Sequence, residues 1–223
     1  MKWDLGRHVF AAAMIVVSVL ASLYFSTILP DVVPSHFGIN GAADQWSPKS
    51  QIFLVGVGAP LVVFVVLTFV PLIDPFWKRI RGKYNVFLGF RDIAIGVLVY
   101  LVIVGYVSAK EGAYESNFAG LGMGLLFILF GNYMPKLPRN FFFGIRTPWT
   151  LASEQVWNQT HRVSGWLFVL AGIVMAGLSF SRIPQYLIIL AVLIPLVLFC
   201  GFIYPYAIYR KLERAEGGDV VKL

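Results

Sequence analysis

The chain is poor in charged residues. Asp, Glu, Lys and Arg make up 13% of its 223 residues, whereas hydrophobic residues make up 58%, and the mean hydropathy is +0.77. Soluble domains carry roughly 45–50% apolar and about 25% charged residues. A water-soluble fold of this length could not bury so much apolar surface. The composition therefore excludes that class and indicates an integral membrane protein.

Cysteine is nearly absent as well. The single cysteine, Cys200, excludes an internal disulfide bond and suggests no metal cluster. The first apolar run, of about 21 residues, exceeds the roughly 7–15 apolar residues of a signal peptide. We therefore expect this run to remain as a helix, and we expect neither a cofactor nor a bound metal.

The chain contains six long uncharged runs, each near the roughly 17–25 residues that a helix needs to cross a bilayer. Helices are expected because lipid offers no hydrogen-bond partner to exposed backbone groups. The predicted fold class is therefore all-α and polytopic, with an interfacial helix between spans four and five. The expected spans are residues 9–29, 52–73, 93–109, 117–134, 163–181 and 183–209.

Basic residues are distributed unevenly between the two sides of these spans. If the amino terminus is cytoplasmic, all but three of the 18 Lys and Arg residues lie inside, and those outside are Lys49, Lys110 and Arg182. This bias predicts a plasma-membrane protein with both termini in the cytoplasm. The net charge of +7 then reflects contact with anionic membrane lipid, and direct nucleic-acid binding is not expected.

A polar segment, residues 29–49, joins the first two spans on the predicted outer side. Its prolines and glycines exclude a regular helix and favour turns. Asn40-Gly41 is typical of a tight turn and predicts a small hairpin between residues 35–39 and 42–46. Ser47-Pro48 is expected to cap and begin the next helix, and Trp46 to lie at the membrane interface.

Seven residues of this outer segment are candidates for recognition: Pro30, Asp31, Pro34, His36, Gly41, Asp44 and Trp46. Asp31, His36 and Asp44 could form a small acidic or metal-binding cluster, but three ligands at irregular spacing are weak evidence for a metal. The simpler interpretation is that these side chains solvate and cap a rigid loop.

A second polar segment, of about 28 residues (135–162), joins spans four and five on the predicted inner side. Gly144 is expected to allow a sharp reversal after three phenylalanines, residues 141–143, which we expect to dip into the interface. Thr147-Pro148 is typical of a helix start, so a helix is predicted from Pro148 to about Arg162. Helical spacing would bring these residues to one face: Glu154, Trp157, Asn158, His161 and Gly165.

Three interpretations of that polar face remain open. In the structural one, tryptophans anchor an amphipathic interfacial helix and arginines bind lipid phosphates. In the second, the face docks a peptide or a protein. In the third, Glu154 or His161 acts as a general base. No nucleophile, orienting group or metal triad accompanies these two residues, so the sequence does not predict an enzyme.

The inner residues form a long motif that includes Gly144-Ile145-Arg146-Thr147-Pro148-Trp149-Thr150-Leu151 and Thr160-His161-Arg162. This motif resembles the signature of the SdpI family, and the outer segment resembles the amino-terminal module that often precedes it. The candidate signature and recognition residues on the inner side are Asn132, Pro135, Lys136, Asn140, Gly144, Arg146, Thr147, Pro148, Trp149, Thr150, Glu154, Trp157, His161 and Arg162.

The resemblance covers nearly the whole chain and implies two modules, with two spans in residues 1–92 and four spans in residues 93–223. The family is named after a bacterial immunity protein that protects its producer against a secreted, membrane-active peptide toxin. That named member is also understood as a receptor that holds a cytoplasmic repressor at the membrane. The resemblance therefore implies membrane immunity, with a peptide toxin as a possible partner outside and a repressor as a possible partner inside.

Two other functions remain as alternatives. One is a small transporter or channel, which we disfavour because the six expected spans contain no Asp, Glu, Lys, Arg or His. The other is an enzyme at the membrane interface that uses Glu154 and His161.

Overall fold

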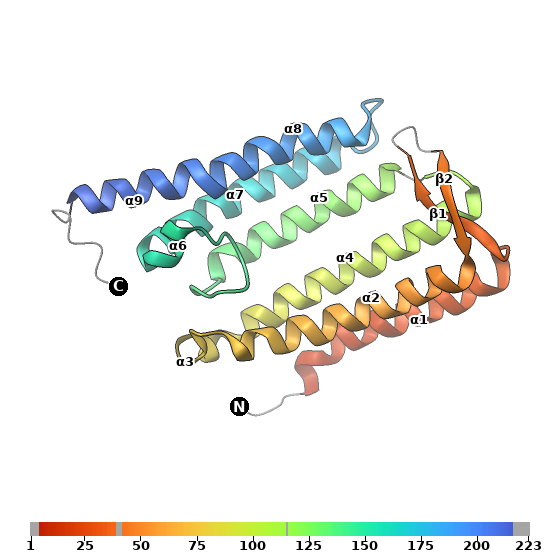
Figure 1. Cartoon of the computed structure of the whole chain (residues 1–223), viewed down its shortest axis with the longest axis horizontal. Helices are drawn as coiled ribbons and strands as arrows, with labels where there is room; N and C mark the ends of the chain where they lie inside the picture. The colour runs from red at the N-terminus through yellow and green to blue at the C-terminus, as the bar shows by residue number, and fades with distance from the viewer. Residues whose placement is uncertain (1–4, 39–41, 115, 216–223) are drawn as a thin grey trace.

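The computed structural model describes residues 5–38, 42–114 and 116–215. Six membrane-length helical segments and one two-stranded hairpin form the fold (Figure 1). The helices are α1 (Val9–Ile28), α2 (Lys49–Phe69), α3 (Trp77–Ile80), α4 (Tyr84–Glu111), α5 (Ser116–Tyr133), α6 (Pro148–Ala152), α7 (Glu154–Leu178), α8 (Gln185–Leu198) and α9 (Tyr204–Ala215), and the strands are β1 (Val32–Phe37) and β2 (Ala43–Pro48).

The prediction of an all-α protein with six spans is confirmed, and the chain is a multi-pass membrane protein. All six spans are longer than predicted, the third and the fifth most of all. The third extends over Trp77–Glu111, where the sequence analysis placed a charged loop, and the fifth begins at Glu154. The sixth is continuous through α8 and α9 because a π-helical turn, Phe199–Ile203, joins them.

The spans pack as two groups of helices. α4 packs against both α1 and α2, α7 packs against α5 and α8, and the contact between α4 and α5 joins the two groups. The hairpin lies at one end of the molecule, and α3, α6 and α9 lie at the other (Figure 1). α1 begins and α9 ends at this second end, as an even number of crossings requires. Which end faces the cytoplasm stays a prediction.

The closest helix pair is α5 and α7, and it depends on glycine. A Cβ added to Gly124 would lie 2.7 Å from the Gly172 carbonyl oxygen, and one added to Gly131 would lie 2.6 Å from the Gly165 carbonyl oxygen. Any side chain there would force the two backbones apart, so the small residues permit this close packing in the membrane.

Arg91 lies fully buried between α4, α1 and α2. Its guanidinium donates to the Asp92 carboxylate, the Arg7 carbonyl oxygen, Thr68 Oγ1 and His8 Nδ1. These contacts use all five N–H donors of the side chain. The expectation that the spans contain no Asp, Glu, Lys, Arg or His is therefore wrong, because the spans extend beyond their predicted bounds: the third contains Arg91 and Asp92, and the fifth contains His161. The mutual pairing of Arg91 and Asp92 makes their burial tolerable.

The hairpin predicted between the first two spans is confirmed, although its first strand begins three residues earlier and its second strand ends two residues later than predicted. β1 and β2 pair in antiparallel fashion, with Val33 opposite Ser47 and Pro34 opposite Trp46. The Asn40-Gly41 turn, and with it the candidate Gly41, lies outside the described residues. The predicted helix start at Ser47-Pro48 is one residue early, since α2 begins at Lys49. Ser47 Oγ instead lies 3.0 Å from Ser35 Oγ and links the two strands.

Candidate functional site

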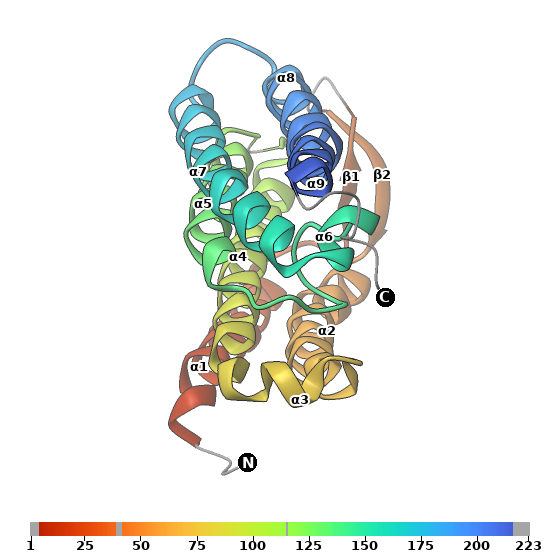
Figure 2. The ribbon, with the colours of Figure 1, turned by 90° about the vertical axis from the view of Figure 1, so that its left-hand side faces the viewer.

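We call residues 132–162 the signature segment. It runs from the end of α5, through the α5–α7 connection, into the first turns of α7. Figure 2 looks onto the end of the molecule that the segment crosses, with α6 beside α9. The connection lies over the bundle, and its contacts decide which signature residues are accessible.

Gly144 and His161 form the centre of the signature segment. The backbone at Gly144 has φ +91°, so the predicted reversal is confirmed. A Cβ at this position would overlap His161 Nε2. The Ile145 N–H donates to Nε2 at 3.0 Å, and Nδ1 lies 2.9 Å from the Trp157 carbonyl oxygen. Since an N–H can only donate, Nε2 accepts, Nδ1 carries the hydrogen, and the imidazole is neutral.

Trp157 and Asn140 hold the connection against α7. Trp157 is fully buried, its Nε1 donates to the Leu137 carbonyl oxygen at 2.9 Å, and its ring stacks on His161 at 4.0 Å. The buried Asn140 amide donates to the Pro138 and Phe143 carbonyl oxygens and accepts from two backbone N–H groups. These side chains provide hydrogen-bond partners for backbone groups of a buried loop that would otherwise lack them.

The predicted helix over residues 148–162 is interrupted. Thr147 caps α6 and Pro148 begins it, as predicted, and Thr150 completes a capping box. α6 ends at Ala152, because Ser153 is extended and caps α7 through Val156 N–H. The expected interfacial helix therefore consists of α6 alone, and its continuation to Arg162 was wrong.

The Arg139 guanidinium donates to the Leu151 and Ala152 carbonyl oxygens at the end of α6, at 3.0 and 3.3 Å. These bonds occupy carbonyl groups that a helix end leaves without intrahelical partners. Arg139 thereby ties the start of the connection to the end of its short helix.

The predicted polar face of residues 154–165 is divided between interior and surface. Trp157, His161 and Gly165 are buried, whereas Glu154, Asn158 and Arg162 are exposed. The reason is that this stretch belongs to a spanning helix packed on α5, not to a helix lying free on the membrane. Both ring nitrogens of His161 bond to backbone groups, so this arrangement does not support its use as a general base.

The other signature residues support the connection or lie at its surface. Arg146 donates to the Phe141 carbonyl oxygen, and Lys136 lies over the Tyr133 ring. Trp149 contacts Tyr206 of α9, Asn132 donates to the Ile128 carbonyl oxygen, and Pro135 packs against Gly165.

The three phenylalanines do not all dip into the interface, as the sequence analysis expected. Phe141 is exposed, but Phe143 packs in the core against Phe87 and Phe90. The connection that carries them is therefore held partly by the bundle.

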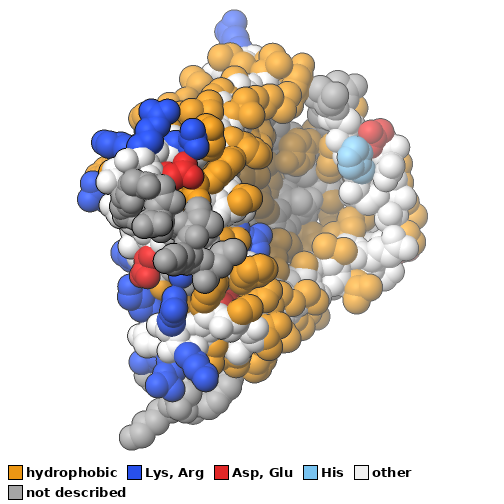
Figure 3. Space-filling view, turned by 60° about the vertical axis from the view of Figure 1, so that its left-hand side comes forward, with side chains coloured by type: hydrophobic (Ala, Val, Ile, Leu, Met, Phe, Trp, Pro, Cys, Tyr) orange, Lys and Arg blue, Asp and Glu red, His pale blue; other side chains and the backbone are white. Residues whose placement is uncertain are grey.

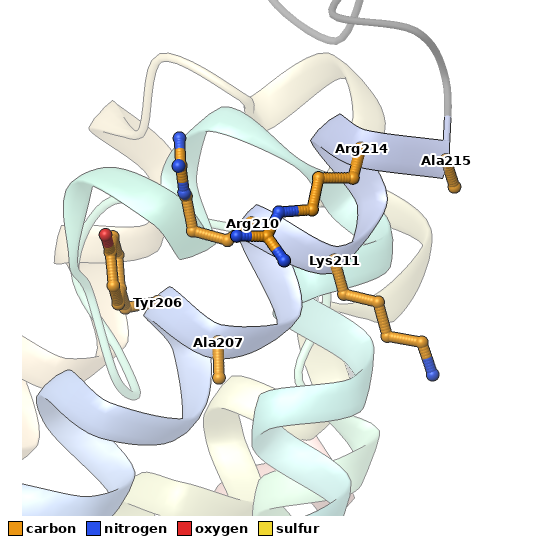
Figure 4. Close-up of a pocket in the computed structure, with 6 residues that line it drawn as sticks. All are labelled: Tyr206, Ala207, Arg210, Lys211, Arg214 and Ala215. Carbon is orange, nitrogen blue, oxygen red and sulfur yellow. The ribbon is translucent and has the colours of Figure 1, made fainter.

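α9 contributes a basic surface beside the signature segment. A hollow of about 540 Å³ is lined by Tyr206, Ala207, Arg210, Lys211, Arg214 and Ala215, all on this one helix. Figure 4 shows the basic side chains extending from the helix in different directions, so they do not converge on a common point. Arg210 also pairs with Glu213 at 2.7 Å. The hollow is an open basic surface and not an enclosed site.

The outer acidic and histidine cluster is split into two pairs. Asp31 pairs with Lys49 at 3.1 Å, whereas His36 Nδ1 lies 2.6 Å from Asp44 Oδ1. Among the described residues, no three His, Cys, Asp or Glu side chains lie close enough to hold a metal. The three side chains therefore do not act as one cluster.

The remaining outer candidates differ in exposure. Pro30 and Trp46 are exposed, and Trp46 is free to contact the membrane interface. Pro34 is buried opposite Trp46 in the hairpin.

Asp74, which was not among the residues expected from the sequence, joins the α2–α3 connection to the signature segment. The side chain is nearly buried, and its carboxylate accepts from the Phe141 and Phe76 N–H groups, each at 2.7 Å. Asp74 precedes Pro75, and this pair is typical of a turn. The local turn was therefore recognisable, but the bond to Phe141 was not.

Comparison with known proteins identifies the carboxy-terminal part of the chain. Residues 136–207 match the model of the SdpI/YfhL protein family. This part of the chain is therefore similar to the members of that family. The match contains the signature residues from Lys136 to Arg162, so the resemblance stated from the sequence is confirmed.

The amino-terminal part matches a second family model, and one relative extends over both parts. Residues 13–58 match a domain of unknown function, DUF1648. The chain is 29% identical to Immunity protein SdpI of Bacillus subtilis (strain 168) over 213 residues, which are 94% of this chain and 99% of that protein. No solved structure matches the chain.

Proposed function

We propose that this protein is a membrane immunity protein that protects its cell against a secreted, membrane-active peptide. One observation carries the proposal: the alignment with Immunity protein SdpI includes both the SdpI/YfhL part and the amino-terminal part, and nearly the full length of each chain. The membrane-spanning fold is consistent with a protein that meets its ligand at or within the bilayer.

The proposal includes an orientation, with the hairpin outside and the signature segment in the cytoplasm. Its support is the concentration of Lys and Arg at the end of the molecule that holds α3, α6 and α9. The orientation is tested by Gln45→Cys on the hairpin and Gln155→Cys on α7, both at exposed positions. The native Cys200 is buried and provides a low background.

A membrane-impermeant maleimide applied to intact cells should label Gln45→Cys and should label Gln155→Cys only after the cells are opened. The reverse pattern would invert the orientation. Equal labelling of both variants before opening would show that the reagent had entered the cells. A cytoplasmic marker protein that stays unlabelled excludes such leakage.

The second part of the proposal concerns the inner surface. The exposed residues Glu154, Asn158 and Arg162, together with the basic surface of α9, form the output side and contact a cytoplasmic repressor. Charged groups on such a surface would set partner choice and association rate. Support for this part comes only from their exposure and charge, because the other signature residues are occupied in holding the connection.

The decisive experiment is survival of a toxin-sensitive strain that expresses the protein while it meets a secreted, membrane-active peptide. We expect the wild-type protein to raise survival and the Glu154→Ala variant to protect equally well. In a membrane co-sedimentation assay, however, Glu154→Ala should no longer recruit the repressor. Arg146→Ala should weaken both effects in proportion to its membrane level, since Arg146 holds the connection. Failure of wild type to protect at a normal membrane level would refute immunity.

Transport and catalysis have weaker support. Arg91 is a buried charge of the kind that a transport path would use, but its five donors are all engaged by protein groups. The exposed Glu154 and the buried His161 form no acid–base pair. Ion flux in proteoliposomes that disappears on substitution of Arg91 would favour transport over immunity.

A further inference from the structure

Two neighbouring hollows lie beneath the hairpin. One, of about 450 Å³, lies between the hairpin, α2 and α4, and the other, of about 1260 Å³, lies between the hairpin and the first turns of α5 and α8. Phe37 and Tyr114 line both hollows, and their rings stack at 5.4 Å. The two hollows therefore adjoin at this aromatic pair, and we call them together the outer cleft.

The outer cleft changes in character with depth. Its walls toward the membrane are apolar and include Val55, Leu98 and Ile189, whereas its rim carries His36 and Asp44. Figure 3 looks onto this side of the molecule, where the surface is hollowed and the walls are mainly hydrophobic. An occupant that fits both regions has an apolar body and a polar end.

The charge of the rim distinguishes between amphipathic occupants. Of the described residues that line the cleft, none is Lys or Arg, and the one carboxylate is that of Asp44. Sites for lipid phosphate are typically basic, so an anionic headgroup would be repelled here. A peptide with an amino or basic group at one end would instead pair with Asp44, which His36 already orients at 2.6 Å.

The size of the cleft also favours a peptide over a small molecule. The larger hollow, about 1260 Å³, exceeds the roughly 300–1,000 Å³ of sites for small molecules. An amphipathic peptide helix that places its apolar face into a hydrophobic groove is a recurring mode of recognition. The volume, the apolar walls and the acidic rim therefore suit one class of ligand.

We propose that the outer cleft binds the apolar segment of a cationic, amphipathic peptide, with a basic group of the peptide at Asp44. This proposal rests on the proposed immunity function and specifies where its ligand binds. It also gives the hairpin a role, because residues of β1 and β2 form one wall of the cleft.

The test is photo-crosslinking of the full chain in proteoliposomes of phosphatidylcholine and phosphatidylglycerol. A photoreactive phenylalanine replaces Tyr186, which lines the cleft, or Tyr24, which is exposed on α1 and does not line it. The probe is a synthetic, biotinylated, cationic amphipathic peptide. We expect position 186 to give about tenfold or more peptide adduct than position 24, because a tenfold higher affinity of the cleft for the peptide would raise its occupancy by about that factor.

Two substitutions test the chemistry of the site. Asp44→Lys should reduce the adduct at position 186 about tenfold, because it reverses the charge at the rim, whereas Asp31→Asn, which alters the neighbouring pair with Lys49, should not. Ala119→Trp should fill the larger hollow and also remove the adduct. Its matched control is Ala12→Trp, at an exposed position on α1.

Three outcomes would overturn the proposal: equal peptide adducts at both positions, lipid adducts alone at position 186, or an adduct that Asp44→Lys leaves unchanged. The lipid result would assign the cleft to lipid. Survival of expressing cells is measured separately. Protection without a peptide adduct refutes the cleft but not immunity, and an adduct without protection refutes immunity but not the cleft.

Discussion

The two polar segments that stand out in the sequence have opposite surroundings in the fold. The signature segment carries its characteristic groups inward, where Trp157, His161 and Asn140 bond to the backbone of its own connection. The outer hairpin carries His36 and Asp44 at the surface, beside a cleft. A polar motif with its donors and acceptors already occupied specifies architecture, whereas one at the edge of a cleft is available to a ligand.

The largest expected effect concerns Trp157. Trp157→Ala should lower the free energy of unfolding by about 3–5 kcal/mol, because it removes a fully buried ring. Trp166 lies on the same helix but is 74% exposed, so Trp166→Ala should have little effect. Denaturant titration in detergent measures both. Equal losses for the two variants would mean that the signature segment does not support the fold.

The next effect separates contact from backbone conformation. Gly144 and Gly112 both have positive φ, 91° and 71°, but only Gly144 has neighbours that an added Cβ would meet. Gly112→Ala should cost about 1–2 kcal/mol, the penalty for a left-handed residue. Gly144→Ala should cost clearly more, because it also displaces His161. Thermal unfolding of the two variants would contradict this ranking if their midpoints fell equally.

A smaller effect is expected at the start of α6. Thr147→Ala removes the side chain that caps this helix and should cost about 1 kcal/mol. Thr147→Ser keeps the hydroxyl oxygen and should recover most of the loss. Unfolding titrations of the two variants distinguish the loss of capping from the loss of methyl contacts. If Thr147→Ser lowered the free energy of unfolding as much as Thr147→Ala, the effect would belong to the methyl group.

The smallest effect is expected in the hairpin. Asp31→Asn breaks an exposed ion pair with Lys49 and should change the free energy of unfolding by no more than about 0.5 kcal/mol. A loss comparable to that of Trp157→Ala would end the contrast between the segments, because it would make the hairpin as important to stability as the signature segment.

Local features of both segments were predictable from the sequence. Gly144 as a reversal and Thr147-Pro148 as a helix start depend on the conformational limits of single residues. The hairpin depends on neighbouring turn residues. The break at Ser153 was also locally encoded, since serine is a favoured helix cap, but the helical spacing beyond it suggested one continuous helix.

Burial in the polar segments was not predictable in the same way. Spacing assigned Glu154, Trp157 and His161 to one helix face, but it could not say that α5 and the returning connection would cover only part of that face. Arg91 was assigned to a loop because a charge next to an apolar run usually marks the end of a span. Its partners, His8 just before α1 and Thr68 of α2, are far from it in the chain.

The sequence alone determined that this is a membrane protein with six spans, because apolar length and composition directly reflect the thickness and polarity of the bilayer. It also determined that the chain reverses at Gly144 and that a helix begins at Pro148. Only the tertiary structure decided which polar groups are occupied and which are accessible. That distinction depends on partners from distant parts of the chain: Ile145 for His161, Leu137 for Trp157, and Phe141 for Asp74.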